Sequence, residues 1–279
     1  MSSAILPFAQ PPAVREVIEA SLRLFGRSVL PCLPLATIGT LLGQLPSAYD
    51  VAVHGKPMPL TAASLADKGG EWWALYVLGT LASLVLWAIV LAKQQRIATG
   101  GAGAPGAGAM LARLPAIVGF CLASFVVVLL VSFPFGLAAA LFAMPPGVRS
   151  ALVLLPILAA SAAVSLGWPA LVLEGRSALA AVAIGLRLAV AHRRRLVLVV
   201  VAILATLIVM VILAGLVVAV ITGLASPAGA AVQGSLSAAV MLLAAALAVL
   251  YLSAFLLVIF DDLRVRTQGA QASRASSSA

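Results

Sequence analysis

The sequence predicts an all-α integral membrane protein with six transmembrane helices and with both termini in the cytoplasm. Of its 279 residues, 63% are hydrophobic and only 9% are charged, so the charged side chains are too few to cover a soluble domain of this size. Six stretches are long enough to cross a bilayer, because a helix of about 20 apolar residues spans the hydrocarbon core. The lysines and arginines lie mainly on one side of these stretches, which predicts the orientation of the helices.

The six stretches are continuously apolar, whereas the strands of a membrane β-barrel would alternate apolar and polar residues. The third stretch is too long for an upright span, and Pro134 predicts either a kink within it or an end that projects beyond the lipid. Dividing this stretch into two spans would carry the basic C-terminal residues to the other side of the membrane, against the charge pattern. The predicted spans are 29–48, 73–92, 114–143, 151–173, 196–222 and 235–260.

The basic residues predict the topology. Fourteen of the 17 lysines and arginines lie before the first span, after the last span, between spans 2 and 3, or between spans 4 and 5. Only Lys56, Lys68 and Arg149 lie in the opposite loops, where acidic residues offset them. The positive-inside rule therefore places both termini in the cytoplasm. The net charge of +9 indicates orientation, with attraction to anionic headgroups as a secondary effect, and we expect no nucleic-acid partner.

Two amphipathic helices are predicted at the cytoplasmic interface, before spans 1 and 5. The first covers about 12–27, where apolar residues recur at spacings of three and four. The second begins after Ser177, a residue suited to an N-cap, and continues to about His192. Both helices lead directly into a span that runs in the same predicted direction.

The loops between the spans differ in character. Pro57 and Pro59 predict that the outer loop 49–71 lacks regular structure, and an interfacial aromatic anchor, Trp72-Trp73-Tyr76, follows it. The glycine- and alanine-rich segment 99–109 is predicted to be a flexible linker. We expect one domain over 1–262 and a flexible cytoplasmic tail over 263–279.

The candidate site residues are charged groups at the predicted cytoplasmic ends of the spans. Glu174 closes span 4, where an ion must be paired or reach water, and Arg113, Arg176 and Arg187 are its candidate partners. Asp261 and Asp262 end span 6, but neighbouring helical residues point about 100° apart, which favours local ion pairs over acid–base catalysis. The alternatives are ion pairs and lipid-headgroup contacts. The candidates are Glu174, Arg176, Arg187, Arg193, Arg194, Arg195, Asp261, Arg264 and Arg266.

Other patterns exclude several functions. No ionisable residue lies deep inside a predicted span, which disfavours ion-coupled carriers and intramembrane hydrolases. The G-x-G-x-x-G match at 101–106 has no strand before it and is interpreted as linker. Asp50 and His54 are interpreted as a solvated loop pair, because too few ligands are available for a metal. We expect no metal and no cofactor. Three small-residue motifs predict close helix packing: Gly39-x-x-x-Gly43, Gly79-x-x-x-Ser83 and Ser161-x-x-x-Ser165.

Three blocks of sequence carry a resemblance to a known family. They are Val14-Arg15-Glu16-Val17 through Leu22-Arg23-Leu24-Phe25; Trp168-Pro169-Ala170-Leu171-Val172-Leu173-Glu174-Gly175 with Leu186-Arg187-Leu188; and Phe260-Asp261-Asp262-Leu263-Arg264-Val265-Arg266. With these blocks the chain resembles the six-helix membrane domain found beside glycerophosphoryl diester phosphodiesterases, and its stand-alone bacterial relatives. The resemblance covers nearly the whole chain and implies a protein of the bacterial inner (plasma) membrane. The phosphodiesterase activity belongs to a separate soluble barrel and is not implied.

These observations favour a non-enzymatic membrane protein that organises the membrane or binds a lipidic or amphipathic ligand. Membrane lipids are its expected partners, and self-association is an open alternative. A channel or exporter for a weakly charged or amphipathic solute is the second hypothesis, since prolines in several spans free backbone carbonyls. A membrane enzyme is disfavoured because nucleophile–base pairs are missing from the sequence pattern.

Overall fold

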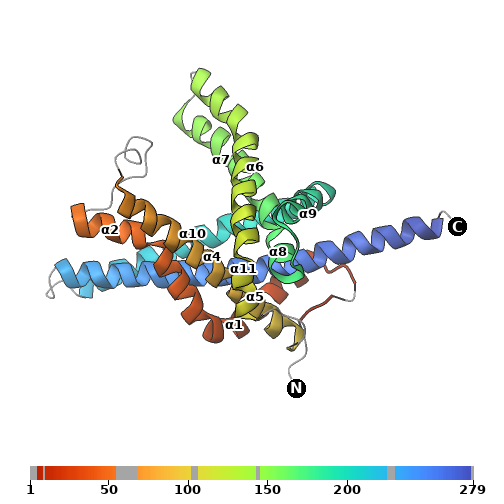
Figure 1. Ribbon diagram of the computed structural model, residues 1–279, viewed down its shortest axis with the longest axis horizontal. Coiled ribbons are helices and arrows are strands. Elements are labelled where there is room, and N and C mark those ends of the chain that lie inside the picture. Colours follow the sequence, from red (N-terminus) through yellow and green to blue (C-terminus); the bar gives the residue numbers. More distant parts are fainter. Residues whose placement is uncertain are drawn as a thin grey trace. The chain divides into compact units, whose positions relative to one another are not determined.

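All regular structure in the described part of the chain is helical. The computed structural model describes residues 5–8, 10–54, 68–101, 106–142, 145–224 and 230–277 (Figure 1). The helices are α1 (Val14–Gly43), α2 (Leu45–His54), α4 (Gly70–Thr99), α5 (Ala107–Ala112), α6 (Leu114–Leu141), α7 (Pro146–Ser165), α8 (Trp168–Glu174), α9 (Ala178–Ala191), α10 (Arg193–Leu224) and α11 (Ala230–Ser277).

Six helical segments are long and apolar enough to cross a membrane. This number confirms the predicted all-helical class and the six spans, and it indicates a multi-pass membrane protein. The segments are Val14–Gly43, Gly70–Thr99, Leu114–Leu141, Gly147–Glu174, Arg193–Val220 and Gln233–Gly269.

The chain forms two compact units, and the single domain over 1–262 stays a prediction. Unit 1 contains Met1–Arg27, Leu91–Thr206 and Tyr251–Ala279, and unit 2 contains Ser28–Val90 and Leu207–Leu250. Four helices, α1, α4, α10 and α11, contribute one end to each unit. The predicted boundary between the amphipathic helix and span 1, near residue 27, coincides with the point where α1 passes from one unit to the other.

The predicted segment 12–27 and most of the predicted span 29–48 form one helix, α1, which ends at Gly43, so the last residues of that predicted span lie in α2. Pro31 and Pro34 lie inside this helix without ending it. A proline removes only one backbone hydrogen bond, whereas unwinding inside an apolar environment would expose several unsatisfied groups, so the helix continues. The second predicted interfacial helix is a separate element, α9, which ends before His192.

Three predictions about loops and the tail need correction. The outer loop 49–71 begins within a helix, since α2 extends to His54, while Pro57 and Pro59 lie outside the described residues. The linker 99–109 ends within α5, which begins at Ala107. Residues 263–277, predicted to be part of a flexible tail, continue α11, and Leu263 at the start of this segment is buried.

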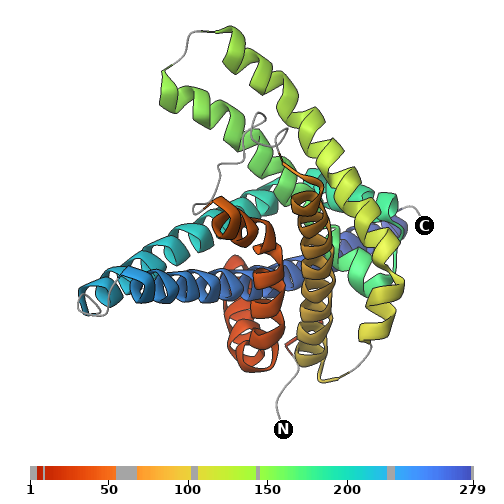
Figure 2. The same cartoon turned by 60° about the vertical axis from the view of Figure 1, so that its left-hand side comes forward.

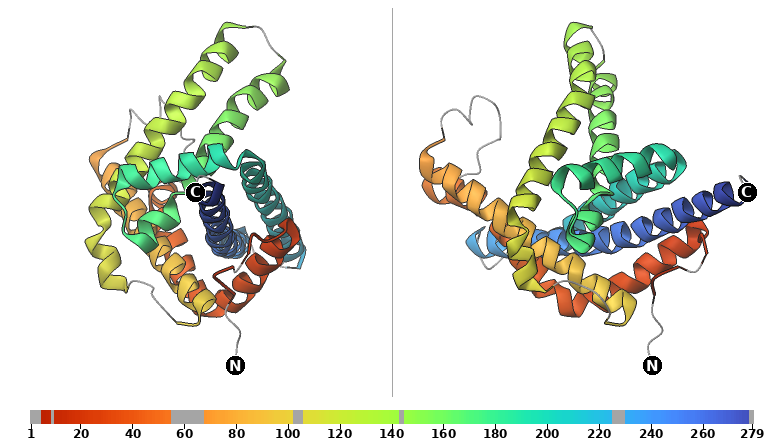
Figure 3. Two further views of the ribbon diagram at one scale, coloured as in Figure 1. Left: turned by 90° about the vertical axis from the view of Figure 1, so that its right-hand side faces the viewer. Right: turned by 45° about the vertical axis from the view of Figure 1, so that its right-hand side comes forward.

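In unit 1, α6 and α7 form a helical hairpin (Figure 2), and α9 packs against α6, α7 and α8 (Figure 3). The predicted span 151–173 is broken at Leu166 and Gly167, which separate α7 from α8. A Cβ on Gly167 would overlap the carbonyl of Ala181 in α9. A Cβ on Gly185 would lie 2.7 Å from the carbonyl oxygen of Ala163. The break therefore lets α9 approach the backbone of span 4.

In unit 2, two of the predicted small-residue motifs bring α1 and α4 together. A Cβ on Gly79 would overlap the carbonyl of Leu42, and one on Gly43 would lie 3.5 Å from Ser83 Oγ. A Cβ on Gly39 would lie 3.1 Å from Trp87 Nε1. The first two motifs thus face each other, as close packing through small residues requires. In the third motif, Ser165 instead donates a hydrogen bond to its own helix.

Candidate functional site

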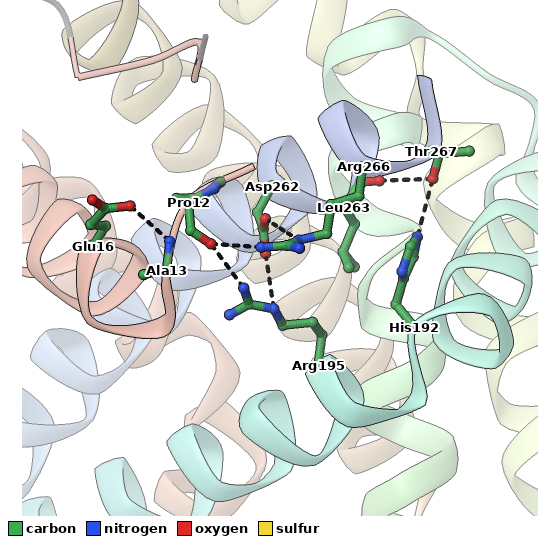
Figure 4. Close-up of polar contacts among 9 residues, drawn as sticks. All are labelled: Pro12, Ala13, Glu16, His192, Arg195, Asp262, Leu263, Arg266 and Thr267. Atoms are coloured by element: carbon green, nitrogen blue, oxygen red, sulfur yellow. Dashed lines mark hydrogen bonds and ion pairs between the residues drawn. The ribbon is translucent and has the colours of Figure 1, made fainter. Parts of the chain in front are cut away.

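The clearest polar site is a buried ion-pair cluster around Asp262 in unit 1 (Figure 4). Asp262 is fully buried. Its Oδ1 lies 2.6 Å from Nε of Arg266, and its Oδ2 lies 3.4 Å from Nε of Arg195. Asp262 and Arg266 are four residues apart on α11 and so share one helix face, whereas Arg195 comes from the first turn of α10.

Both arginines also bind the backbone just before α1. Nη2 of Arg195 donates to the carbonyl of Pro12 at 2.9 Å, and Nη2 of Arg266 donates to the same oxygen at 2.6 Å (Figure 4). Pro12 is buried. Because the two guanidinium groups share one carboxylate and one carbonyl, the N-terminal segment is fastened to the start of α10 and to α11.

Three further hydrogen bonds hold the N-terminal segment in unit 1. The amide of Phe8 donates to Oδ2 of Asp261 at 2.9 Å. The amides of Ile5 and Leu6 donate to the carbonyl of Ala98 at 2.8 and 3.1 Å. Asp261 and Asp262 therefore point to different partners, as their predicted angular separation on a helix requires.

His192 lies between α9 and α10 beside this cluster. Its Nε2 is 3.3 Å from Oγ1 of Thr267 (Figure 4). Burial lowers the pKa of His192, the positive charges of Arg266 and Arg195 lower it further, and Asp262 opposes the change. The imidazole is therefore mainly neutral at pH 7, because its ordinary pKa is already about 6.5.

Glu174 forms a second and more exposed group of ion pairs. Its Oε1 lies 2.9 Å from Nη1 of Arg264, and its Oε2 lies 3.3 Å from Nε of Arg176. The side chains of these two arginines are more than half exposed. Ion pairs of this kind contribute about 0–1 kcal/mol each.

Arg113, a candidate partner of Glu174, has a different role. Its Nη1 donates to the carbonyl of Val172 and lies 3.5 Å from the carbonyl oxygen of Leu171. A cation at this place satisfies the last carbonyls of α8 and complements its dipole. Gly175 follows with a φ of 66°, and a Cβ there would lie 2.8 Å from Arg113 Nη2, so glycine suits both the backbone and the space.

The nine predicted site residues therefore fall into separate sets. Arg195 and Arg266 join the Asp262 cluster, Asp261 binds the N-terminal segment, and Glu174 pairs with Arg176 and Arg264. The other three are exposed and make no ion pair within the described part of the chain: Arg187, Arg193 and Arg194.

The site prediction omitted the residues at the centre of the cluster. Local ion pairs were predicted for Asp262 although it was not named as a site residue, and its i,i+4 spacing to Arg266 is visible in the sequence. Pro12 and His192 carry no such signal, since their contacts join segments far apart in the chain.

Unit 2 contains a buried ion pair that corrects the interpretation of Asp50. Asp50 is 2% exposed, and its Oδ1 lies 2.5 Å from Nζ of Lys68. The same ammonium group lies 5.1 Å from the centre of the Trp72 ring, at a distance typical of a cation–π contact. Asp50 is therefore not part of a solvated loop pair, and the side chain of His54 lies outside the described residues.

A neighbouring contact extends this arrangement. The hydroxyl of Tyr49 donates to Oε2 of Glu71 at 2.9 Å, and this hydrogen bond raises the pKa of Tyr49 above its ordinary value. The aromatic anchor is divided, since Trp72 is buried while Trp73 and Tyr76 are exposed. Trp72 and Tyr76 are stacked, with ring centres 5.4 Å apart.

Unit 2 also has a largely apolar groove of about 690 Å³. Its walls come from α1, α2 and α11. Leu41, Met241 and Leu242 are among its apolar lining residues. Its polar lining residues are uncharged: Thr40, Gln44 and Ser47. Such a groove can hold an alkyl chain and a small uncharged polar group.

The described residues contain no group of three histidine, cysteine, aspartate or glutamate side chains that could hold a metal ion. No family model matches the chain, and neither the curated proteins nor the solved structures give a match.

Proposed function

We propose that this chain is a non-enzymatic, multi-pass protein of the bacterial inner membrane that binds a lipidic or amphipathic ligand. The observation that carries the proposal is the groove in unit 2, which is lined by apolar side chains and by the uncharged Thr40, Gln44 and Ser47. A charged solute would lose its hydration in the groove without gaining a counter-ion. An alkyl chain from the bilayer would exchange one set of apolar contacts for another, at no such cost.

The position of the groove along the chain supports a ligand from the bilayer. Residues 40–48 lie at the end of the first predicted span, and residues 238–245 lie near the start of the sixth. With both termini in the cytoplasm, these parts of α1 and α11 lie toward the outer leaflet. The expected ligand is therefore an uncharged or zwitterionic amphiphile whose acyl chain occupies the groove.

The test is lipid retention measured by native mass spectrometry of the protein purified in a mild detergent. Ala239→Trp should fill the groove and reduce the retained lipid, because Ala239 lines it. Leu243→Trp is the matched control, since Leu243 lies on the same helix, is 45% exposed and is not among the lining residues. Equal lipid retention in the two variants and the parent would overturn the proposal.

The same preparation distinguishes the alternative functions. Flux of an uncharged solute through liposomes that contain the protein would favour the channel or exporter. The mass spectrum also reports self-association directly. A monomer that retains no lipid and allows no flux would contradict both hypotheses.

A further inference from the structure

Unit 1 contains a basic pocket of about 320 Å³ at the start of α10, and two of its lining residues, Arg195 and Arg266, also pair with Asp262. Arginines from two helices line it. The lining residues are Ala191, His192, Arg193, Arg194, Arg195 and Arg266.

The lining carries an excess of positive charge. Arg195 and Arg266 share the single carboxylate of Asp262. Arg193 and Arg194 are exposed, and neither makes an ion pair with a described residue. Four guanidinium groups are thus balanced by one carboxylate. The lowered pKa of His192, to which Arg266 and Arg195 contribute after burial, is consistent with a positive potential here.

Part of the pocket is held in place before any ligand arrives. Arg195 and Arg266 are oriented by Asp262 and by the carbonyl of Pro12 (Figure 4). Nη1 of Arg195 is buried and has no hydrogen-bond acceptor among the described residues, which leaves one donor of this arginine unsatisfied. Oriented arginines lose less conformational entropy on binding than free ones, and planar guanidinium groups suit phosphate oxygens.

The pocket also lies at an end of a candidate span. The apolar segment of α10 begins at Arg193, so the first turn of this helix lies where a bilayer places its headgroups. The positive end of the helix dipole is at the same place and favours an anion.

We propose that this pocket binds the phosphate group of an anionic membrane lipid. The site is independent of the apolar groove in unit 2, because the two share no residue. The shared chemistry is a phosphate ester, which a lipid or a water-soluble compound could supply.

The test compares short-chain phosphatidylglycerol with phosphatidylcholine of the same chain length, using the full chain in a neutral detergent. The double variant Arg193→Gln/Arg194→Gln removes two charges that make no described ion pair, so the Asp262 cluster stays intact. The matched control, Arg176→Gln/Arg187→Gln, removes two exposed arginines of the same unit that do not line the pocket. Inorganic phosphate serves as the competitor without acyl chains.

We expect phosphatidylglycerol to bind about tenfold more tightly than phosphatidylcholine, and the pocket variant to lose this preference while the control keeps it. Equal preference in the pocket variant and the parent would overturn the proposal. If inorganic phosphate at the same concentration displaced phosphatidylglycerol, the pocket would not require a lipid as the source of the phosphate group, and that part of the proposal would be overturned. If the double glutamine variant does not fold, the single variants Arg193→Gln and Arg194→Gln replace it, and an unchanged preference for phosphatidylglycerol in both would overturn the proposal.

Discussion

Gly185 of α9 lies against Gly167, one of the two residues between α7 and α8, so closely that a Cβ on Gly185 would be 2.8 Å from the amide nitrogen of Gly167. It would also be 3.0 Å from the carbonyl oxygen of Val164. Both neighbours are backbone atoms and cannot rotate away. We therefore expect Gly185→Ala to destabilise the protein by about 1–3 kcal/mol, seen as a lower midpoint of thermal unfolding in detergent.

Gly136→Ala in α6 is the control for that substitution, because a Cβ there meets no atom within 4 Å. Where the added methyl group meets open space, replacing a helical glycine by alanine should leave stability unchanged or raise it by up to about 1 kcal/mol. Equal midpoints for the two variants would contradict the close approach of α9.

Gly79→Ala should disrupt the contact of α1 with α4 in unit 2. A Cβ at Gly79 would overlap the carbonyl of Leu42, which lies within a helix and can move only with its whole turn. We expect the free energy of unfolding to fall by about 1–3 kcal/mol because the added methyl group overpacks this contact. The control is Gly215→Ala in α10, where a Cβ meets nothing within 4 Å, and unfolding of both variants is followed by loss of helical circular dichroism. A stable Gly79→Ala protein would show that this packing is wrong.

Asp262→Asn should lower the free energy of unfolding by about 3–5 kcal/mol, because it removes the buried carboxylate that balances two guanidinium groups. Glu174→Gln should cost about 1 kcal/mol or less, since its arginine partners are more than half exposed to water. Thermal unfolding of the two variants in one buffer gives the comparison. A larger effect for Glu174→Gln would reverse the assigned importance of the two clusters.

His192 should make the protein less stable in acid. Its pKa is lowered in the folded state, so the unfolded chain binds the proton more readily. The resulting loss of folding stability is absent well above about pH 6.5, and it grows as the pH falls from there toward the folded-state pKa. The charged and polar groups near it are Arg195, Arg266, Asp262 and Thr267. In His192→Asn, the unfolding midpoint should fall less between pH 7 and pH 5 than in the parent, and an identical fall would contradict this role.

The topology can be tested with single cysteines in a Cys32→Ala/Cys121→Ala background. A membrane-impermeant maleimide should label Arg194→Cys in inside-out vesicles and Val53→Cys in right-side-out vesicles, since both positions are exposed. The reason is the excess of lysine and arginine on the predicted cytoplasmic side. The opposite labelling pattern would reject the orientation and, with it, the outer-leaflet position of the groove.

Local spacing predicted several features well. The apolar runs located six spans, and Gly39, Gly43, Gly79 and Ser83 predicted close packing that α1 and α4 share. The break at Gly167 was missed, because span 4 is apolar on both sides of it and the cause is the approach of α9. The helix over Leu45–His54 was missed because the prolines that suggested a loop come only after it.

The sequence by itself determined the class of the protein and the positions of its spans. The free energy of transferring a helix into lipid is a sum over about 20 neighbouring residues, and it does not depend on contacts with distant parts of the chain. It also determined the i,i+4 pairing of Asp262 with Arg266, which one helix turn brings together. Only the tertiary structure decided that Arg195 joins them, that both arginines bind the carbonyl of Pro12, and which lining surrounds the groove and the basic pocket. These features arise from segments far apart in the chain, and their juxtaposition depends on packing of the whole unit rather than on local preference.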